Sequence, residues 1–101
     1  KAAESLDRAI ALVPGHEQAW YHKGECLLSQ GLAREALHAF EMAIEPDPDD
    51  AMARNGKGLS EHESGRYEEA VRSFDRAVQI DPDYAAAWSN KGISLRELAD
   101  Q

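Results

Sequence analysis

Residues 17–50 read EQAWYHKGECLLSQGLAREALHAFEMAIEPDPDD, and residues 51–84 repeat their pattern after 34 positions. The Lys-Gly pair at 23–24 recurs at 57–58 and again at 91–92. Phe40 and Phe74 keep the same spacing, and Trp20 and Trp88 stand two periods apart. Chance does not align so many residues at one period, so the chain is built from repeats of 34 residues.

Each repeat carries the pattern of two helices. The first helices are expected at 17–30, 51–64 and 85–98, and the second helices at 1–12, 33–45 and 67–80. In the second helices, apolar residues recur at a spacing that places them on one helical face. They are Ala36, Leu37, Phe40, Ala43 and Ile44 in one repeat and Ala70, Val71, Phe74, Ala77 and Val78 in the next. The pattern predicts an all-α fold with six helices.

Glycine, proline and aspartate mark the ends of these helices. Gly31 and Gly65 lie in the turn inside a repeat, where glycine adopts a positive φ without strain. Prolines at positions 14, 48 and 82 follow the second helices, because proline disfavours the helical conformation of the residue before it. Acceptors for the N-terminus of the next helix are expected from Asp49, Asp50 and Asp83.

One second helix is expected to be shorter than the others. Pro46 stands where the equivalent residues are Leu12 and Ile80. Because proline has no N–H and clashes with the preceding turn, this helix should end near Ile44 or Glu45.

These features together resemble the tetratricopeptide repeat. The residues that carry the resemblance are Trp20, Gly24, Ala36, Phe40, Ala43 and Pro48, at a period of 34. It covers the whole chain as one domain: a second helix at 1–16, full repeats at 17–50 and 51–84, and a first helix at 85–101. The resemblance implies an α-solenoid, a right-handed superhelix of antiparallel helix pairs. Its first helices would line a concave groove that usually holds an extended or helical peptide.

The resemblance also implies which side chains face this groove. They are Tyr21, Glu25, Leu28, Met52, Asn55, Leu59, His62, Ser89 and Ile93. The leucines, Met52 and Ile93 would form an apolar strip suited to apolar side chains of a ligand.

One kind of ligand does not fit the expected groove. Some members of the family hold a C-terminal acidic peptide with Lys and Asn, but Tyr21 and Glu25 occupy those positions here. Glu25 would repel the carboxylate of such a ligand. The expected partner is therefore a protein or peptide segment with apolar and basic side chains, and an acidic chaperone tail is not expected.

The middle repeat departs from the pattern on its first helix. Arg54 replaces the tryptophan of the other repeats, and Glu61 replaces a leucine, with Lys57 one turn before Glu61. Two interpretations stay open. The three residues form a half-buried ion cluster in place of apolar packing, or they form a polar recognition spot. The recurring Lys23, Lys57 and Lys91 leave a similar choice, between packed stems with solvated ammonium groups and a basic stripe.

Composition excludes several classes of function. The net charge of −8, from 19 acidic and 11 basic residues, disfavours nucleic acid as a partner. No segment approaches the roughly 18 consecutive apolar residues of a membrane span, and the N-terminus lacks a secretory signal, so a cytoplasmic setting is expected. Cys26 is the single cysteine, so no intramolecular disulfide is expected.

Catalytic and metal chemistry also lack a motif. The chain has no glycine-rich phosphate loop and no nucleophile signature. His22 and Cys26 are one helical turn apart, but no third ligand stands at a suggestive spacing. We therefore expect no enzyme, no cofactor and no metal site.

The two ends of the chain suggest a second function. Leu6 and Ile10 at one end, and Trp88, Leu95 and Leu98 at the other, would lie on faces that a neighbouring repeat normally covers. A head-to-tail association of chains through these residues would continue the superhelix. The alternative is a slice of a longer array, whose other helices cover the same faces.

Overall fold

The computed structural model describes residues 17–101, and this part of the chain is helical. Its helices are α2 (Glu17–Ser29), α3 (Ala33–Ile44), α4 (Ala51–Glu63), α5 (Tyr67–Ile80) and α6 (Ala85–Ala99). The all-α fold is confirmed, and the bounds agree with the expected ranges to within one residue at nearly every end. The sixth expected helix, at 1–12, lies outside the described residues.

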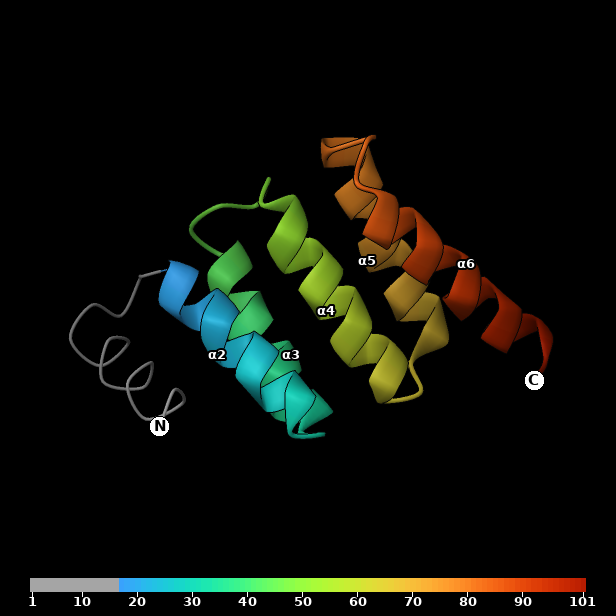
Figure 1. Cartoon of the computed structure of the whole chain (residues 1–101), viewed down its shortest axis with the longest axis horizontal. Coiled ribbons are helices and arrows are strands. Elements are labelled where there is room, and N and C mark those ends of the chain that lie inside the picture. Colours follow the sequence, from blue (N-terminus) through green and yellow to red (C-terminus); the bar gives the residue numbers. More distant parts are fainter. Residues whose placement is uncertain (1–16) are drawn as a thin grey trace.

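The helices form two layers (Figure 1). Helices α2, α4 and α6 lie side by side in the front layer, and α3 and α5 lie behind them. Consecutive helices pack against each other from α2 to α6, and α4 also contacts α2 and α6 directly. This is the stack of antiparallel helix pairs that the repeat predicts. None of the helices in 17–101 is long and apolar enough to cross a membrane.

The turn inside each repeat is closed by glycine, as predicted. Gly31 and Gly65 have φ angles of 80° and 81°. The following N–H of Leu32 donates to the carbonyl oxygen of Leu27 at 2.9 Å, and that of Arg66 donates to Glu61 at 2.8 Å. Such a bond closes the C-terminus of a helix and lets the chain reverse into the next one.

The helix ends confirm the predicted role of Asp50 and correct two others. Asp50 precedes α4, and its carboxylate accepts from the N–H of Ala53 at 3.2 Å. Asp49 does not cap the helix, because only the residue directly before α4 is placed to do so; its carboxylate pairs with Arg76 at 3.3 Å. Asp83 is also one residue too early, since the residue before α6 is Tyr84, which makes no side-chain cap.

Pro46 shortens α3 as predicted. Helix α3 ends at Ile44, with Glu45 as its C-terminal flanking residue. Helix α5 continues to Ile80, the residue equivalent to Pro46.

The core consists of small residues around two phenylalanine rings. Phe40 and Phe74 are buried, and most of the other buried apolar residues are alanines: Ala19, Ala36, Ala39, Ala43, Ala53, Ala70, Ala77 and Ala87. Each ring lies on a glycine of the first helix of its own repeat. A Cβ atom added to Gly24 would lie 2.8 Å from the Phe40 ring, and one added to Gly58 would lie 2.5 Å from the Phe74 ring. At Gly92 the same added atom would meet nothing within 4 Å.

The polar residues of the middle repeat are structural in this fold. The Arg54 Nε donates to the carbonyl oxygen of Pro48 at 3.1 Å, and the Trp88 Nε1 donates to that of Pro82 at 2.8 Å. Arg54 therefore supplies the same N–H bond as the tryptophan one repeat later. Glu61 is only 5% exposed and accepts a 2.5 Å hydrogen bond from the Ser73 hydroxyl. These contacts favour the packing interpretation over a recognition spot.

Two of the three recurring lysines, Lys23 and Lys91, lie against other side chains of the fold. Lys91 Nζ lies 2.6 Å from the Asp75 carboxylate on α5 and 5.5 Å from the centre of the Trp88 ring. Lys23 Nζ lies 5.8 Å from the centre of the Trp20 ring. These two ammonium groups therefore interact with neighbouring side chains of the fold.

Candidate functional site

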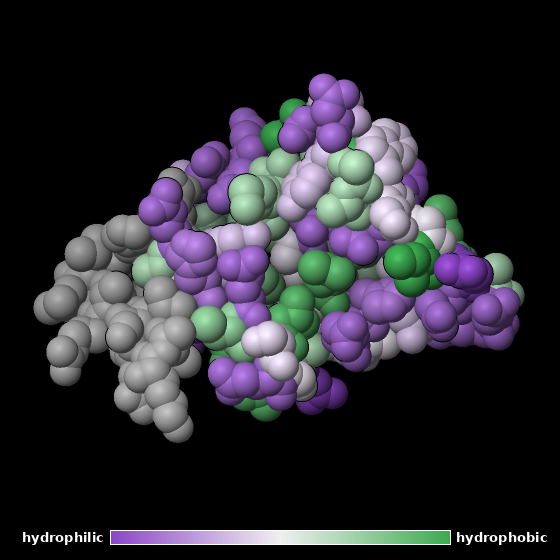
Figure 2. Space-filling model, viewed as in Figure 1, coloured by the Kyte–Doolittle hydropathy of each residue, from purple (hydrophilic) through white to green (hydrophobic). Residues whose placement is uncertain are grey.

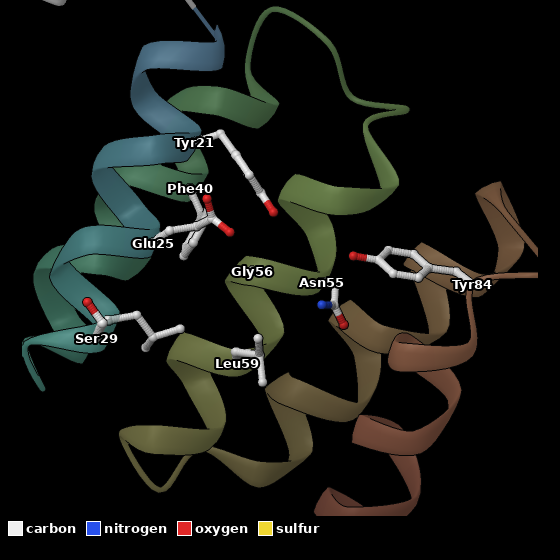
Figure 3. A pocket seen from close by; sticks show the side chains of 9 residues that line it. Tyr21, Glu25, Ser29, Phe40, Asn55, Gly56, Leu59 and Tyr84 are labelled. Carbon is white, nitrogen blue, oxygen red and sulfur yellow. The ribbon is translucent and has the colours of Figure 1, made fainter. Parts of the chain in front are cut away.

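The face formed by α2, α4 and α6 contains a hollow of about 430 Å³ between α2 and α4 (Figure 3). It is lined by Tyr21, Glu25, Leu28, Ser29, Phe40, Asn55, Gly56, Leu59 and Tyr84. The walls come from two first helices and from the start of a third, and Phe40 reaches the hollow from α3 behind.

Two tyrosines face each other across α4. Tyr21 extends from α2, and Tyr84 is the residue directly before α6. Their hydroxyl groups point toward one another (Figure 3). The edge of the Tyr21 ring packs on Phe40, with 5.7 Å between ring centres. Because this contact ties the ring to the core, Tyr21 is a rigid wall of the hollow.

A buried asparagine on α4 links this helix to α6. Asn55 is 7% exposed, and its Oδ1 accepts from the Asn90 Nδ2 at 3.1 Å. Its amide also hydrogen bonds to Tyr84, an interaction that by itself lowers the pKa of the phenol. The hydrogen bond between Asn55 and Asn90 fixes the spacing between α4 and α6 along this face.

Both phenols are held in the protonated form. Burial raises the pKa of Tyr21, and the Glu25 carboxylate raises it further by its charge and by a hydrogen bond. Burial also raises the pKa of Tyr84, more than the bond to Asn55 lowers it. The carboxylates of Asp50 and Glu25 add to the increase at Tyr84. Each hydroxyl can therefore both donate to a ligand and accept from it at neutral pH.

Two smaller hollows continue the first along the same face. One, of about 280 Å³, is lined by Gln18, Tyr21, His22, Asp50 and Met52. The other, of about 170 Å³, is lined by Leu59, His62, Glu63, Phe74, Asn90 and Ile93. Because they share Tyr21 and Leu59 with the first hollow, the three form one surface, which we call the groove. In Figure 2, apolar side chains gather between α2 and α4 and polar side chains surround them.

The structure places eight of the nine expected groove residues around these hollows. Ser89 is the exception: it is exposed on α6 and lines none of the three. Several other residues line the hollows without being expected from the sequence, among them Phe40, Tyr84 and Asn90. Asn90 stands one residue after the position expected to face the groove, and Tyr84 stands where the preceding repeat has the capping Asp50. No periodic signal marks either one.

The residues expected to mediate self-association are only partly described. Trp88 and Leu95 are 49% and 45% exposed on α6, and Leu98 is half-buried. Leu6 and Ile10 lie outside the described residues.

The candidate metal ligands do not converge in the described part of the chain. His22 Nδ1 lies 3.3 Å from the Glu25 carboxylate. Across residues 17–101, no three His, Cys, Asp or Glu side chains come together in a way that could hold a metal ion.

A family model described as tetratricopeptide repeat matches residues 1–50, 27–85 and 58–98. The chain belongs to the tetratricopeptide repeat family. Comparison of this repeat protein with curated protein sequences finds no match.

Solved structures of other repeat proteins share the fold. YrrB, described as a tetratricopeptide repeat protein with an unusual peptide-binding site, is 32% identical, with a TM-score of 0.82 over 86% of this chain and 45% of its own. MamA from Desulfovibrio magneticus RS-1 is 26% identical, with a TM-score of 0.90 over 97% of this chain and 55% of its own. The repeat protein thus spans about half the length of each.

A third structure shares the fold at lower identity. The second tetratricopeptide domain of human RPAP3, in complex with the HSP70 peptide SGPTIEEVD, is 20% identical. Its TM-score is 0.88 over 91% of this chain and 77% of its own. This likeness concerns the fold alone.

Proposed function

We propose that this chain is a protein-interaction scaffold whose groove holds an extended peptide segment of another protein. The observation that carries the proposal is the groove itself, with leucines on its floor and fixed polar groups on its walls. Leu28 and Leu59 are half-buried and offer apolar contact, while Tyr21, Asn55 and Tyr84 offer hydrogen bonds. Sites for ligands commonly combine an apolar lining with a few polar groups that set orientation.

Similar structures support the proposal. YrrB is described as having a peptide-binding site, and the RPAP3 domain was solved with a peptide. The same stack of helices can therefore hold an extended chain.

The proposal is tested by placing a charge on the apolar floor. Peptides are first selected from a random display library on the wild-type chain, and their affinities are measured by fluorescence anisotropy. Leu59→Asp should weaken the selected peptides about 10-fold or more, because burial of a leucine-sized surface contributes roughly 1.5–3 kcal/mol. Leu32→Asp is the matched control, since Leu32 is exposed in a turn and lines none of the groove hollows. Equal losses in both variants, or none in Leu59→Asp, would refute a site in the groove.

A second candidate function is head-to-tail self-association. It is favoured by the outer face of α6, where Trp88 and Leu95 are about half exposed and Gly92 lacks the ring that covers Gly24 and Gly58. A helix from another copy would cover this face. The wild-type mass in analytical ultracentrifugation should then rise with concentration, and Leu95→Asp should remain monomeric. A wild-type chain that is monomeric at every concentration would remove this candidate.

A further inference from the structure

The charged groups of the groove have one sign. Among the described residues that line its three hollows, Glu25, Asp50 and Glu63 carry carboxylates, and none is a lysine or an arginine. Basic side chains of the fold are engaged elsewhere: Lys91 binds Asp75, and Arg54 binds the backbone of Pro48. The groove therefore presents a negative potential to a ligand.

This potential is concentrated between the two tyrosines. The Glu25 carboxylate hydrogen bonds to Tyr21 and also acts on Tyr84 across the hollow. Asp50, at the N-terminus of α4, acts on both phenols as well. Carboxylates from α2 and from the N-terminus of α4 thus direct negative charge toward the space that the two hydroxyl groups face.

The same space offers acceptors on more than one side. The Tyr21 and Tyr84 oxygens face it from opposite walls, and Glu25 extends toward it from α2. Glu25 is about half exposed, and its two carboxylate oxygens offer more acceptor positions than its contact with His22 uses. A guanidinium group is planar and carries five N–H donors, which suits several acceptors around one point. An ammonium group is compact and strongly hydrated, and fits such a site less well.

We infer that the groove selects a basic segment, with an arginine side chain between Tyr21 and Tyr84 against Glu25, and apolar neighbours of that arginine over Leu28 and Leu59. This inference rests on the proposed function and names the chemistry of its ligand. It separates this groove from one that receives an acidic peptide, such as the SGPTIEEVD segment bound by the RPAP3 domain. Carboxylates in that segment would meet Glu25 and Asp50 with like charge.

The test uses four fluorescein-labelled nonapeptides that differ at one residue. Each has leucine on both sides of a central arginine, lysine, citrulline or glutamate, and binding is followed by fluorescence anisotropy at low and high ionic strength. The arginine peptide should bind about 10-fold more tightly than the citrulline peptide, since a hydrogen bond to a charged group is stronger than a neutral one. Lysine should fall between them, and glutamate should bind most weakly. High ionic strength should narrow these differences.

Matched variants assign the preference to Glu25. Glu25→Gln should bring the arginine and citrulline peptides to within about 2-fold of each other, since the side chain keeps its size but loses its charge. Glu25→Lys should reverse the order, so that the glutamate peptide binds more tightly than the arginine peptide. Glu35→Gln removes an equal charge from an exposed residue on α3 and should leave the preference unchanged.

The outcomes separate this inference from the proposed function. If the four peptides bind equally while Leu59→Asp abolishes their binding, the groove is a peptide site without a basic preference, and the inference is wrong. The inference also fails if the arginine peptide does not bind. It fails too if Glu25→Gln keeps the same preference for the arginine peptide over the citrulline peptide as wild type. If binding occurs but neither Leu59→Asp nor Glu25→Lys changes it, both proposals fail.

Discussion

Gly58→Ala is expected to destabilise the chain, whereas Gly92→Ala, at the equivalent position one repeat later, is expected to stabilise it. The added Cβ at Gly58 would lie 2.5 Å from the fully buried ring of Phe74, much closer than van der Waals contact allows. Overpacking of this kind costs about 1–3 kcal/mol, and the helix propensity of alanine offsets only about 1 kcal/mol of it. Urea denaturation followed by circular dichroism measures the difference.

Gly92→Ala is the matched control because it has the same helical setting without the ring. Nothing lies within 4 Å of the added atom, so the propensity gain of up to about 1 kcal/mol should appear alone. Equal shifts in the two variants would show that the phenylalanine does not rest on Gly58 as the structure describes.

Glu61→Leu is expected to raise the free energy of unfolding at pH 7 by about 1–4 kcal/mol, the range seen when buried charged groups are replaced by apolar ones. Glu61 is 5% exposed, and leucine occupies the equivalent position in the neighbouring repeats. The Ser73 hydroxyl loses its acceptor in this variant, which reduces the gain by about 1 kcal/mol. Combining Glu61→Leu with Ser73→Ala should restore that part. Denaturant midpoints that fall in both variants would contradict the expectation.

The effect of Glu61 should depend on pH in a defined direction. Burial raises its pKa above the ordinary value of 4.5, although the Ser73 hydroxyl and Lys57 oppose the rise. A raised pKa in the folded state means that the protonated carboxyl favours folding below about pH 4.5, and that this advantage is lost as pH rises through the folded pKa. Glu61→Gln stays neutral, so its stability relative to wild type should increase from pH 4 to pH 7.

An exposed carboxylate controls for general effects of pH. Glu68 has a side chain 73% exposed on α5, paired only loosely with Arg72 at 3.7 Å. Glu68→Gln should show almost the same pH dependence as wild type. If Glu61→Gln follows that same profile, Glu61 is not buried in the folded chain.

The fold could be predicted because its determinants recur at one period. The two phenylalanines, the glycines that they pack on and the turn glycines all recur after 34 residues. This pattern reveals the helices and their order. The effect of Pro46 on the end of α3 could also be predicted, since the missing N–H of proline acts locally.

The partner of Glu61 could not be predicted. The sequence offers Lys57, one turn away, but the hydrogen bond comes from Ser73, which only the packing of α5 on α4 brings near.

The groove could be predicted only where it follows the repeat. Tyr21, Asn55 and Leu59 stand at positions that the family uses, and the structure places them around one hollow. Tyr84 replaces the capping Asp50 of the preceding repeat, and nothing in the sequence shows that its ring turns toward Asn55. The residue that completes the opposite wall thus belongs to a linker, where periodicity carries no information.

The packing of Phe40 between α2 and α4 makes the width of the groove part of its specificity. The ring lies against Gly24 on α2 and against Gly56 on α4, and its edge forms part of the hollow between them. It therefore acts as a spacer of fixed size that sets how far Glu25 stands from Asn55. A ligand cannot widen that gap without disturbing the core, so it must carry side chains whose own spacing matches. Replacing Phe40 with a side chain of another size would change which peptides fit the groove, even though most of Phe40 lies out of reach of a peptide.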